Sequence, residues 1–214
     1  MSLTRIIAID GPDGSGKTKQ IDTLYEYLTE AGHNTYRTRA SGGTPIAREL
    51  RKVSLSNIER EPEVDLYISL AMHTALGHDL SQKKNQYDVI IIDRSPLTIL
   101  AYNAYGSQLK DISHAYNACE KMLRLWQLTD LLVFSINENE LSTRQQKRLV
   151  DQPDETTNFF EVQDSEFKRR VRSGYAKAYE FARDLRDIGT KTYVTDANGS
   201  VDEVHETIKK QLGI

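Results

Sequence analysis

Short apolar runs alternate with longer amphipathic stretches along the chain. Strands are predicted at residues 5–9, 34–39, 88–93, 130–135 and 190–195. A helix is predicted after the first strand, where Ile21, Leu24, Tyr25 and Leu28 fall on one face. Further helices are predicted near residues 61–85, 97–105, 112–128, 157–187 and 200–212. The alternation predicts an α/β fold with a parallel sheet of about five strands sandwiched between α-helices.

The organisation of the chain points to a single domain. No internal repeat and no linker rich in Pro, Gly or Ser divides residues 1–214. Residues 141–158 fit neither the strand nor the helix pattern, because charged and amide side chains fill the segment. Its position directly after the fourth predicted strand is typical of a mobile lid over a ligand. Its composition taken alone favours a solvated helix–loop–helix.

Composition and charge narrow the classes of function. The formal net charge is −3, from 28 basic and 31 acidic residues, which gives no support to a general nucleic-acid-binding surface. No window approaches the ~20 apolar residues of a membrane span, and no signal-peptide core is visible. The single cysteine, Cys119, has no partner for an intramolecular disulfide. We therefore expect a cytoplasmic protein with no nucleic-acid or membrane partner.

The strongest chemical signal follows the first predicted strand, where the chain matches the phosphate-binding pattern G-x-x-x-x-G-K-[ST]. The matching residues are Gly11, Pro12, Asp13, Gly14, Ser15, Gly16, Lys17 and Thr18. The backbone N–H groups of such a loop point at phosphate oxygens, and the following helix presents its positive end to them. We expect Lys17 to bring charge to the outer phosphates and the Thr18 hydroxyl to ligate Mg²⁺.

A site of this kind also needs an acidic residue near the metal, at the tip of a neighbouring strand. Asp93 ends the most apolar predicted strand, and Arg94 follows it directly, close enough to contact a transferring phosphate. No Asn-Lys-x-Asp stretch for guanine recognition is present, and a motor-type ATPase would be longer. The pattern therefore predicts a small Mg²⁺-dependent kinase that uses a nucleoside triphosphate.

Several motifs, in the same order, resemble the thymidylate kinases, which transfer a phosphoryl group from ATP to dTMP. The matching segments are residues 9–18, 38–46, 93–95, 101–106, 159–161, 167–175 and 194–197. Among them, residues 38–46 match the segment usually written T-R-E-P-G-G-T-P, and residues 93–95 stand where the family has D-R-Y. The resemblance covers nearly the whole chain. It implies a P-loop NTPase-type fold with a lid, ATP as donor, Mg²⁺ as cofactor and a homodimer paired through helices.

The resemblance also implies roles for individual residues. The acidic residue of the loop, here Asp13, meets the substrate sugar in the family, and the arginine of T-R-E-P, here Arg39, holds the acceptor phosphate. The implied substrate-binding residues are Asp13, Arg39, Arg94, Ser95, Tyr102 and Asn103. The implied metal-binding residues are Thr18 and Asp93.

Phosphoryl transfer spreads negative charge over the oxygens of the moving group, and positioned cations there contribute much of the rate. The phosphate-binding loop contains no arginine, so a further cation must come from elsewhere. Arg144 and Arg148 in the lid segment are the candidates. We therefore predict catalytic roles for Lys17, Arg94, Arg144 and Arg148.

The departures from the family pattern concern the acceptor. The Glu and Pro of R-E-P are Ala40 and Ser41, and the tyrosine of D-R-Y is Ser95. The phenylalanine that stacks on thymine and the arginine that bonds it have no counterpart, since these positions fall on Ala71 and Ala75. The phosphoryl-transfer residues are thus present, whereas base recognition is rebuilt.

Three functions are consistent with these residues. The leading hypothesis is transfer of the γ-phosphoryl group of ATP to a deoxynucleoside monophosphate, first of all dTMP, giving dTDP. A kinase for a free nucleoside or another monophosphate is the nearest alternative, and Arg39 favours a monophosphate because a neutral hydroxyl acceptor has no use for it. A catalytically silent, nucleotide-binding regulatory module is the alternative from another class. The intact Lys17, Thr18, Asp93 and Arg94 argue against it.

Overall fold

Five parallel strands form one sheet in the order β2-β3-β1-β4-β5. The computed structural model describes residues 3–151, 159–160 and 163–214. The strands are β1 (Arg5–Asp10), β2 (Thr35–Arg39), β3 (Val89–Asp93), β4 (Asp130–Ser135) and β5 (Lys191–Asp196). The predicted α/β fold with about five parallel strands is confirmed.

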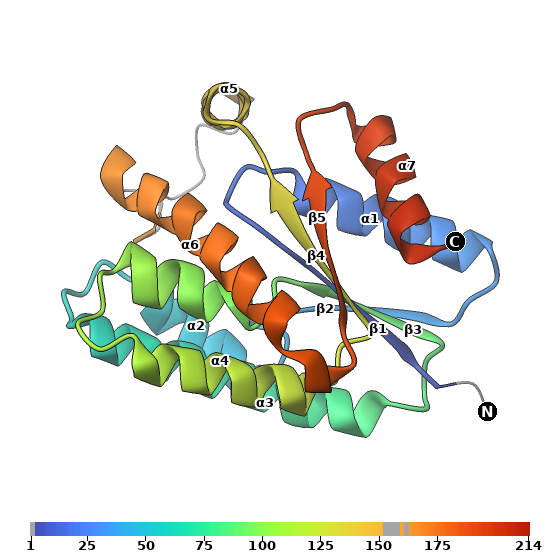
Figure 1. Cartoon of the computed structure of the whole chain (residues 1–214), viewed down its shortest axis with the longest axis horizontal. Coiled ribbons are helices and arrows are strands. Elements are labelled where there is room, and N and C mark those ends of the chain that lie inside the picture. Colours follow the sequence, from blue (N-terminus) through green and yellow to red (C-terminus); the bar gives the residue numbers. More distant parts are fainter. Residues whose placement is uncertain (1–2, 152–158, 161–162) are drawn as a thin grey trace.

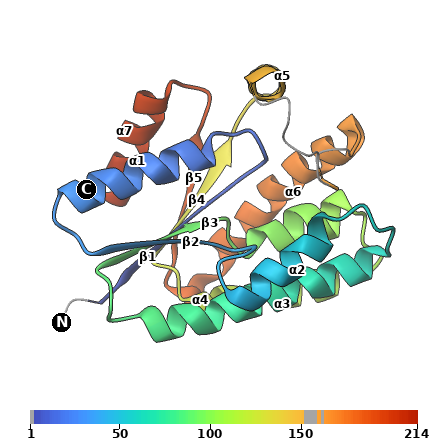
Figure 2. The same cartoon turned by 180° about the vertical axis from the view of Figure 1, so that it is seen from behind.

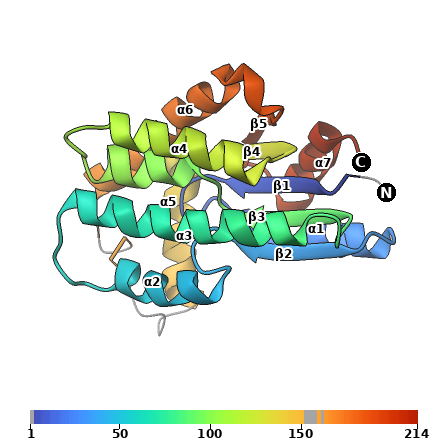
Figure 3. The same cartoon turned by 90° about the horizontal axis from the view of Figure 1, so that it is seen from below.

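Helices cover both faces of the sheet (Figures 1 and 2). They are α1 (Lys17–Glu30), α2 (Pro45–Leu55), α3 (Pro62–Lys83), the π-helix η1 (Ile99–Gly106), α4 (Ser113–Trp126), α5 (Glu138–Asp151), α6 (Ser165–Asp184), the 3₁₀ turn η2 (Arg186–Ile188) and α7 (Val201–Leu212). Helices α1 and α7 pack on one face, and η1, α3, α4 and α6 cover the other. Figure 3 shows α4, α3 and α2 side by side in that order.

The central strand β1 is apolar at consecutive positions because both of its faces are covered. Ile7 and Ile9 point to the layer of α1 and α7, whereas Ile6 and Ala8 point to the layer of α3, α4 and α6. All four side chains are at most 1% exposed. Packing on both faces fixes the position of β1 in the sheet. It therefore also fixes the place where the phosphate-binding loop begins.

Helix α2 was not predicted from the sequence. Helical signals are nevertheless present in the sequence, because Ile46, Leu50 and Val53 fall at helical spacing, although Ala47 is the only buried residue of the helix. A start signal is present as well. The Thr44 hydroxyl accepts a hydrogen bond from the Ala47 amide (3.2 Å), and Pro45 occupies the first turn, where its missing N–H costs nothing.

The predicted helix near 157–187 begins later than expected. Helix α6 starts at Ser165, because the Asp164 carboxylate caps it by accepting a hydrogen bond from the Phe167 amide (2.7 Å). Residues 157–158 and 161–162 lie outside the described residues. The other predicted helices match α1, η1, α3, α4 and α7, with η1 taking π-helical rather than α-helical form.

The segment predicted as a lid, residues 141–158, begins as a helix rather than as irregular structure. Helix α5 runs to Asp151, and residues 152–158 lie outside the described residues. In Figure 1, α5 lies beyond the carboxyl ends of β4 and β5. Its buried Leu141 approaches Gly14 so closely that a Cβ on that glycine would lie 3.1 Å from the Leu141 Cδ1 atom. The helical part of the segment therefore packs on the phosphate-binding loop.

Strand register brings the predicted site residues together at one edge. Asp93 on β3 pairs with Ile9 on β1 and with Arg39 on β2. The carboxyl ends of these three neighbouring strands therefore deliver the loop, the acidic residue and the predicted phosphate-holding arginine to the same place. Ligands of open α/β sheets bind at this edge.

Helix α6 packs closely on η1, next to the edge of the sheet at which the predicted site residues meet. A Cβ on Gly174 would lie 2.9 Å from the Ala101 Cα atom and 3.1 Å from its carbonyl oxygen. Both contacts are with backbone, which cannot rotate away. The absence of a side chain at Gly174 therefore sets how near the two helices can approach.

Gly174→Ala should lower the free energy of unfolding by about 1–2 kcal/mol, because the overlap with the η1 backbone outweighs the higher helix propensity of alanine. Urea unfolding measures the change. Ser173→Ala on the exposed side of α6 is the matched control and should be neutral or slightly stabilising. A Gly174→Ala protein as stable as this control would contradict the packing argument.

Candidate active site

The phosphate-binding loop takes a conformation that glycine makes possible. Gly11, Gly14 and Gly16 all have positive φ values, of 144°, 88° and 90°. At Gly11 the space is closed as well, since a Cβ would lie 2.9 Å from the Phe134 Cβ on β4. The loop therefore curls against the sheet and delivers the N-terminus of α1, which begins at Lys17.

Lys17 is held inside this curl. Its ammonium group donates to the carbonyl oxygens of Gly11 and Pro12, both at 2.8 Å. Burial, followed by the nearby Arg94 guanidinium, lowers the pKa of Lys17 to about 8. The charged form of the Lys17 ammonium is thus destabilised by burial in the loop, and a bound anion would stabilise it.

Asp10, at the end of β1, is the most heavily bonded side chain of this edge. Its fully buried carboxylate accepts hydrogen bonds from the Gly11 amide (2.8 Å), the Ser95 amide and hydroxyl (2.9 and 2.7 Å), the Thr98 hydroxyl (3.1 Å) and the Tyr175 hydroxyl (2.7 Å). These donors come from the loop, the segment after β3 and helix α6. A buried carboxylate needs such donors to offset its lost hydration.

Arg94 lies beside this network in a left-handed backbone conformation, with φ of 72°. Its guanidinium donates to the Tyr175 hydroxyl (2.9 Å), pairs with Asp13 and lies 3.8 Å from the Asp10 carboxylate. It also lies 5.0 Å from the centre of the Tyr102 ring. Burial alone would lower the pKa of Arg94, but the carboxylates of Asp13 and Asp10 hold it above its ordinary value. The guanidinium is thus charged and fixed in direction.

Lys17 and Arg94 line one cavity of about 580 Å³. The predicted site residues that line it are Asp13, Gly14, Gly16, Lys17, Thr18, Arg39, Asp93, Arg94, Tyr102, Asn103 and Arg144. Gly11, Pro12 and Ser15 shape the loop behind it. Ser95 differs from the prediction, because its fully buried side chain bonds to Asp10 and does not line the cavity. The side chain of Arg148 lies outside the described residues.

Asp93 offers an unused ligand to this cavity. One carboxylate oxygen, Oδ1, is buried and has no hydrogen-bond partner in the described part of the chain, while Oδ2 lies 3.8 Å from the Arg39 guanidinium. The Thr18 residue lines the same space. Hard oxygen donors of this kind suit Mg²⁺. Within the described ranges, no group of three or more His, Cys, Asp or Glu side chains forms a metal cage, so phosphate and water would have to complete the coordination.

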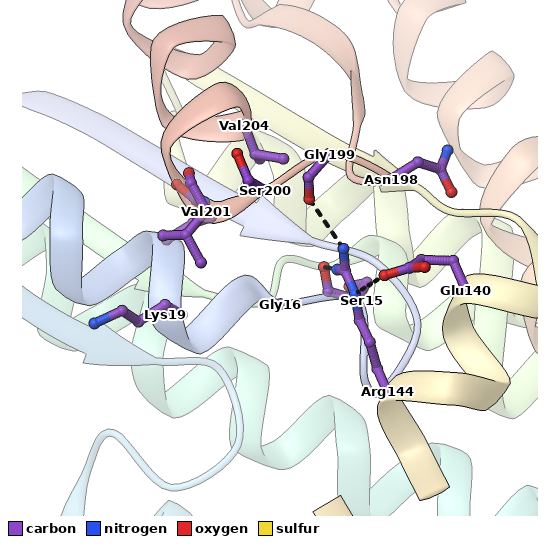
Figure 4. Close-up of a pocket in the computed structure, with 11 residues that line it drawn as sticks. Ser15, Gly16, Lys19, Glu140, Arg144, Asn198, Gly199, Ser200, Val201 and Val204 are labelled. Carbon is purple, nitrogen blue, oxygen red and sulfur yellow. Dashed lines mark hydrogen bonds and ion pairs between the residues drawn. The ribbon is translucent and has the colours of Figure 1, made fainter. Parts of the chain in front are cut away.

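Arg144 of α5 joins the loop to the far side of the site (Figure 4). Its guanidinium donates to the Glu140 carboxylate (2.7 Å), the Ser15 carbonyl (3.3 Å) and the Gly199 carbonyl (3.1 Å). It lines both the first cavity and a second one of about 430 Å³, which lies between the loop and the segment after β5. Arg144 therefore contributes to the walls of both cavities.

Sequence reasoning missed several residues of the site. Asp10 and Tyr175 lie in segments quoted for the resemblance, but their shared hydrogen bond spans 165 residues and leaves no local signal. On α3, the cavity is lined by Ser69 and Met72, whereas Ala71 is exposed. The aligned position of the missing phenylalanine thus points away from the cavity. Arg51 of the unpredicted helix α2 also lines it.

One of the two histidines of α3, His73, has a structural role. His73 is fully buried, lies against the Trp126 ring with 5.5 Å between ring centres, and has its Nδ1 atom 2.7 Å from the Ser69 carbonyl. It is not among the residues that line the cavity. Burial lowers its pKa, so the ring is neutral.

The fold and the loop define a P-loop nucleotide-binding protein, and comparison with known proteins narrows the class. The thymidylate kinase family model matches residues 9–208. The thymidylate kinase of Syntrophotalea carbinolica is 32% identical over 213 residues, covering 94% of this chain and 92% of that protein. That of Maridesulfovibrio salexigens is 28% identical over 219 residues, with 96% and 94% covered. The chain belongs to the thymidylate kinase family.

A solved structure agrees with the fold. The crystal structure of thymidylate kinase from Ehrlichia chaffeensis superimposes with a TM-score of 0.70 at 23% identity and covers all of both chains. In the described part of the chain, no helix is long and apolar enough to cross a membrane.

Proposed function

We propose that the protein is an ATP:dTMP phosphotransferase, which converts ATP and dTMP to ADP and dTDP. One observation supports this most directly. The loop cation Lys17, the fixed Arg94 and Arg39 line a single cavity, which gives the phosphate groups of a donor and an acceptor three cations to bind. Family membership supports the identity of donor and acceptor.

In the proposed reaction, a phosphate oxygen of dTMP attacks the γ-phosphorus of ATP. The new P–O bond forms as the bond to the β-phosphate oxygen breaks, and ADP leaves. A phosphate oxygen is already an adequate nucleophile, so no strong general base is needed. Lys17 and Arg94 stabilise the charge on the transferred group, and Arg39 holds the acceptor phosphate. Their fixed positions are what lowers the barrier.

The remaining residues take supporting roles. Asp13 and Tyr102, joined by a 2.6 Å hydrogen bond, and the neighbouring Asn103 line the acceptor side. Arg144 acts from the lid as a cation for the donor phosphates, after giving up its bonds to the Ser15 and Gly199 carbonyls. A role for Arg148 stays a prediction.

Mg²⁺ fits this site through Thr18 and the unpartnered oxygen of Asp93. When bound with ATP, it would add positive charge at the phosphate oxygens. The protein's own contribution is to hold those two ligands at the base of the cavity, on α1 and β3.

A homodimer, a single domain over residues 1–214, a cytoplasmic location and the absence of nucleic-acid and membrane partners stay predictions. Exposed apolar side chains on α2 and α3, such as Val53, Val64 and Tyr67, support the homodimer, because a partner could cover them.

The reaction is tested by measuring ADP release with Mg²⁺-ATP against dTMP, dUMP, dCMP, dGMP, thymidine and no acceptor. We expect the highest kcat/KM with dTMP. Preference for another monophosphate would contradict dTMP as the acceptor. Preference for thymidine would contradict the role of Arg39. If the protein binds ATP but releases no ADP with any acceptor, it is a regulatory module rather than a kinase.

The lowered pKa of Lys17 predicts a pH-dependent affinity for ATP. Because ATP binds the charged ammonium and the pKa in the free protein is about 8, affinity is full below pH 8 and is lost as pH rises. The dissociation constant should increase by up to about tenfold per pH unit between pH 8 and 9.5. Titration calorimetry measures it. Lys17→Met should bind weakly at all pH values in this range, and an equal pH slope in both proteins would contradict the assignment.

A further inference from the structure

Arg60 lies in the loop between α2 and α3, and its side chain does not line the cavity of the candidate active site. The side chain is only 6% exposed. Its Nε atom donates to the Asp65 carboxylate (2.5 Å), and its two Nη atoms donate to the carbonyl oxygens of Ser54 (2.7 Å), Ser56 (3.2 Å) and Ile58 (2.9 Å). All three nitrogens of the guanidinium are therefore bonded, and the plane of the group is held in one orientation.

The partners of Arg60 belong to two different helices. The last carbonyl oxygens of a helix have no partner within the helix. Arg60 bonds that of Ser54, in the last turn of α2, and that of Ser56, which follows the helix, so that a positive charge lies at the negative end of α2. Asp65, in the first turn of α3, pairs with the same guanidinium. Arg60 thus joins the end of α2 to the start of α3.

A third segment, from much further along the chain, contacts the same end of α2. The Phe159 amide donates to the Leu55 carbonyl (3.2 Å). The Phe159 ring lies over the Arg60 guanidinium, with 4.8 Å between the guanidinium carbon and the ring centre. A cation above the face of an aromatic ring is attracted by the electrons of the ring, and more strongly when both groups are desolvated. Arg60 therefore holds Phe159 on the end of α2.

The position of Phe159 determines where the next residue lies. Phe160 lines the active-site cavity, together with Ser54 and Leu55 from the end of α2. The Phe160 ring centre lies 5.2 Å from that of Phe159 and 5.5 Å from that of Tyr102, which also lines the cavity. The end of α2 and residues 159–160 thus form one wall of the cavity, beside Tyr102 on the acceptor side.

We propose that Arg60 is a positioning residue for the acceptor: it holds Phe159 on the end of α2 and thereby keeps Phe160 in the wall against which the acceptor binds. In this role, which rests on the proposed function, Arg60 touches neither substrate. The donor binds at the phosphate-binding loop, and within the described residues no partner of Arg60 belongs to that loop. When the contact with Phe159 is lost, binding of the acceptor must supply the free energy of ordering this wall.

The test compares the steady-state constants of the wild type, Phe159→Leu, Phe159→Tyr and Tyr179→Leu with Mg²⁺-ATP and dTMP. Leucine keeps the backbone donor and much of the apolar volume of Phe159 but removes the ring above Arg60, whereas tyrosine keeps the ring. Tyr179→Leu is the matched control. The half-buried Tyr179 ring also has a cation above it, with the Arg183 guanidinium carbon 5.9 Å from the ring centre, and it does not line the cavity.

Phe159→Leu should raise the KM for dTMP by about 3- to 30-fold, the range expected for the loss of a cation–π contact, and change the KM for ATP by less than about twofold. Phe159→Tyr and Tyr179→Leu should match the wild type within about twofold. An unchanged KM for dTMP in Phe159→Leu would overturn the proposal. So would equal rises in the KM for dTMP and ATP, or the same rise in Tyr179→Leu.

A second comparison tests whether Phe159 acts through Arg60. Arg60→Lys keeps a positive charge beside Asp65, so that the buried carboxylate is not left unpaired, but it removes the planar group that bonds three carbonyls and contacts the ring. In this background, Phe159→Leu should raise the KM for dTMP by less than about a further twofold. The same factor in both backgrounds would overturn the role of Arg60. If the wild type prefers another monophosphate, dTMP fails as the acceptor, and the same comparisons on that monophosphate decide the role of Arg60.

Discussion

Asp10 carries a negative charge where water cannot reach it, and the surrounding chain is arranged to offset that charge. Its carboxylate is fully buried and accepts hydrogen bonds from the phosphate-binding loop, from Ser95 and Thr98 after β3, and from Tyr175 on α6. Leaving such a group unsatisfied would cost several kcal/mol, on the order of a large part of a domain's stability. The fold is therefore constrained to bring these segments together whenever it forms.

The hydrogen bonds that satisfy the Asp10 carboxylate also orient a cation of the cavity. Tyr175 bonds both Asp10 and Arg94, so the network that satisfies the buried carboxylate also directs the guanidinium into the cavity. More cationic than anionic side chains line the cavity, and burial, followed by the like charges of neighbouring arginines, lowers the pKa of Lys17 and of Arg51. Bound phosphate groups would stabilise these charges. In the proposed reaction, substrate binding and the positioning of the transferring group would thus depend on one electrostatic arrangement.

The sequence was informative where the signal is local. The P-loop pattern located Lys17 and Thr18. Apolar runs located β1, β3 and β4, because a strand buried on both faces must be apolar throughout, whereas the more polar edge strands β2 and β5 were placed by the alternation of strands and helices. Helix α2 was not predicted, although the helical spacing of Ile46, Leu50 and Val53 and the start signal at Thr44 and Pro45 were present in the sequence. The Asp10 network escaped because its partners meet only in the folded chain. Ser95 was assigned to the substrate by its place in a motif, whereas its hydroxyl in fact bonds to Asp10.

The departures from the family pattern that we expect to concern base recognition fall on α3, at Ala71 and Ala75. Ser69 and Met72, rather than aromatic or charged side chains, face the cavity from this helix. Phe160 also lines it, beside Tyr102, with 5.5 Å between ring centres. In the proposed reaction, contacts with the phosphate group would therefore supply much of the binding of the acceptor, and the base would contribute through shape and apolar contact.

The dependence of Arg94 on the Asp10 network is tested most directly by a double-mutant cycle. The kcat/KM for dTMP with Mg²⁺-ATP is measured for the wild type, Tyr175→Phe, Arg94→Lys and the double variant. If Tyr175 acts by directing the Arg94 guanidinium, Tyr175→Phe lowers kcat/KM by about tenfold in the wild-type background and by less than about twofold once Arg94 is lysine. An equal factor in both backgrounds would show that the two residues act independently and would contradict the coupling.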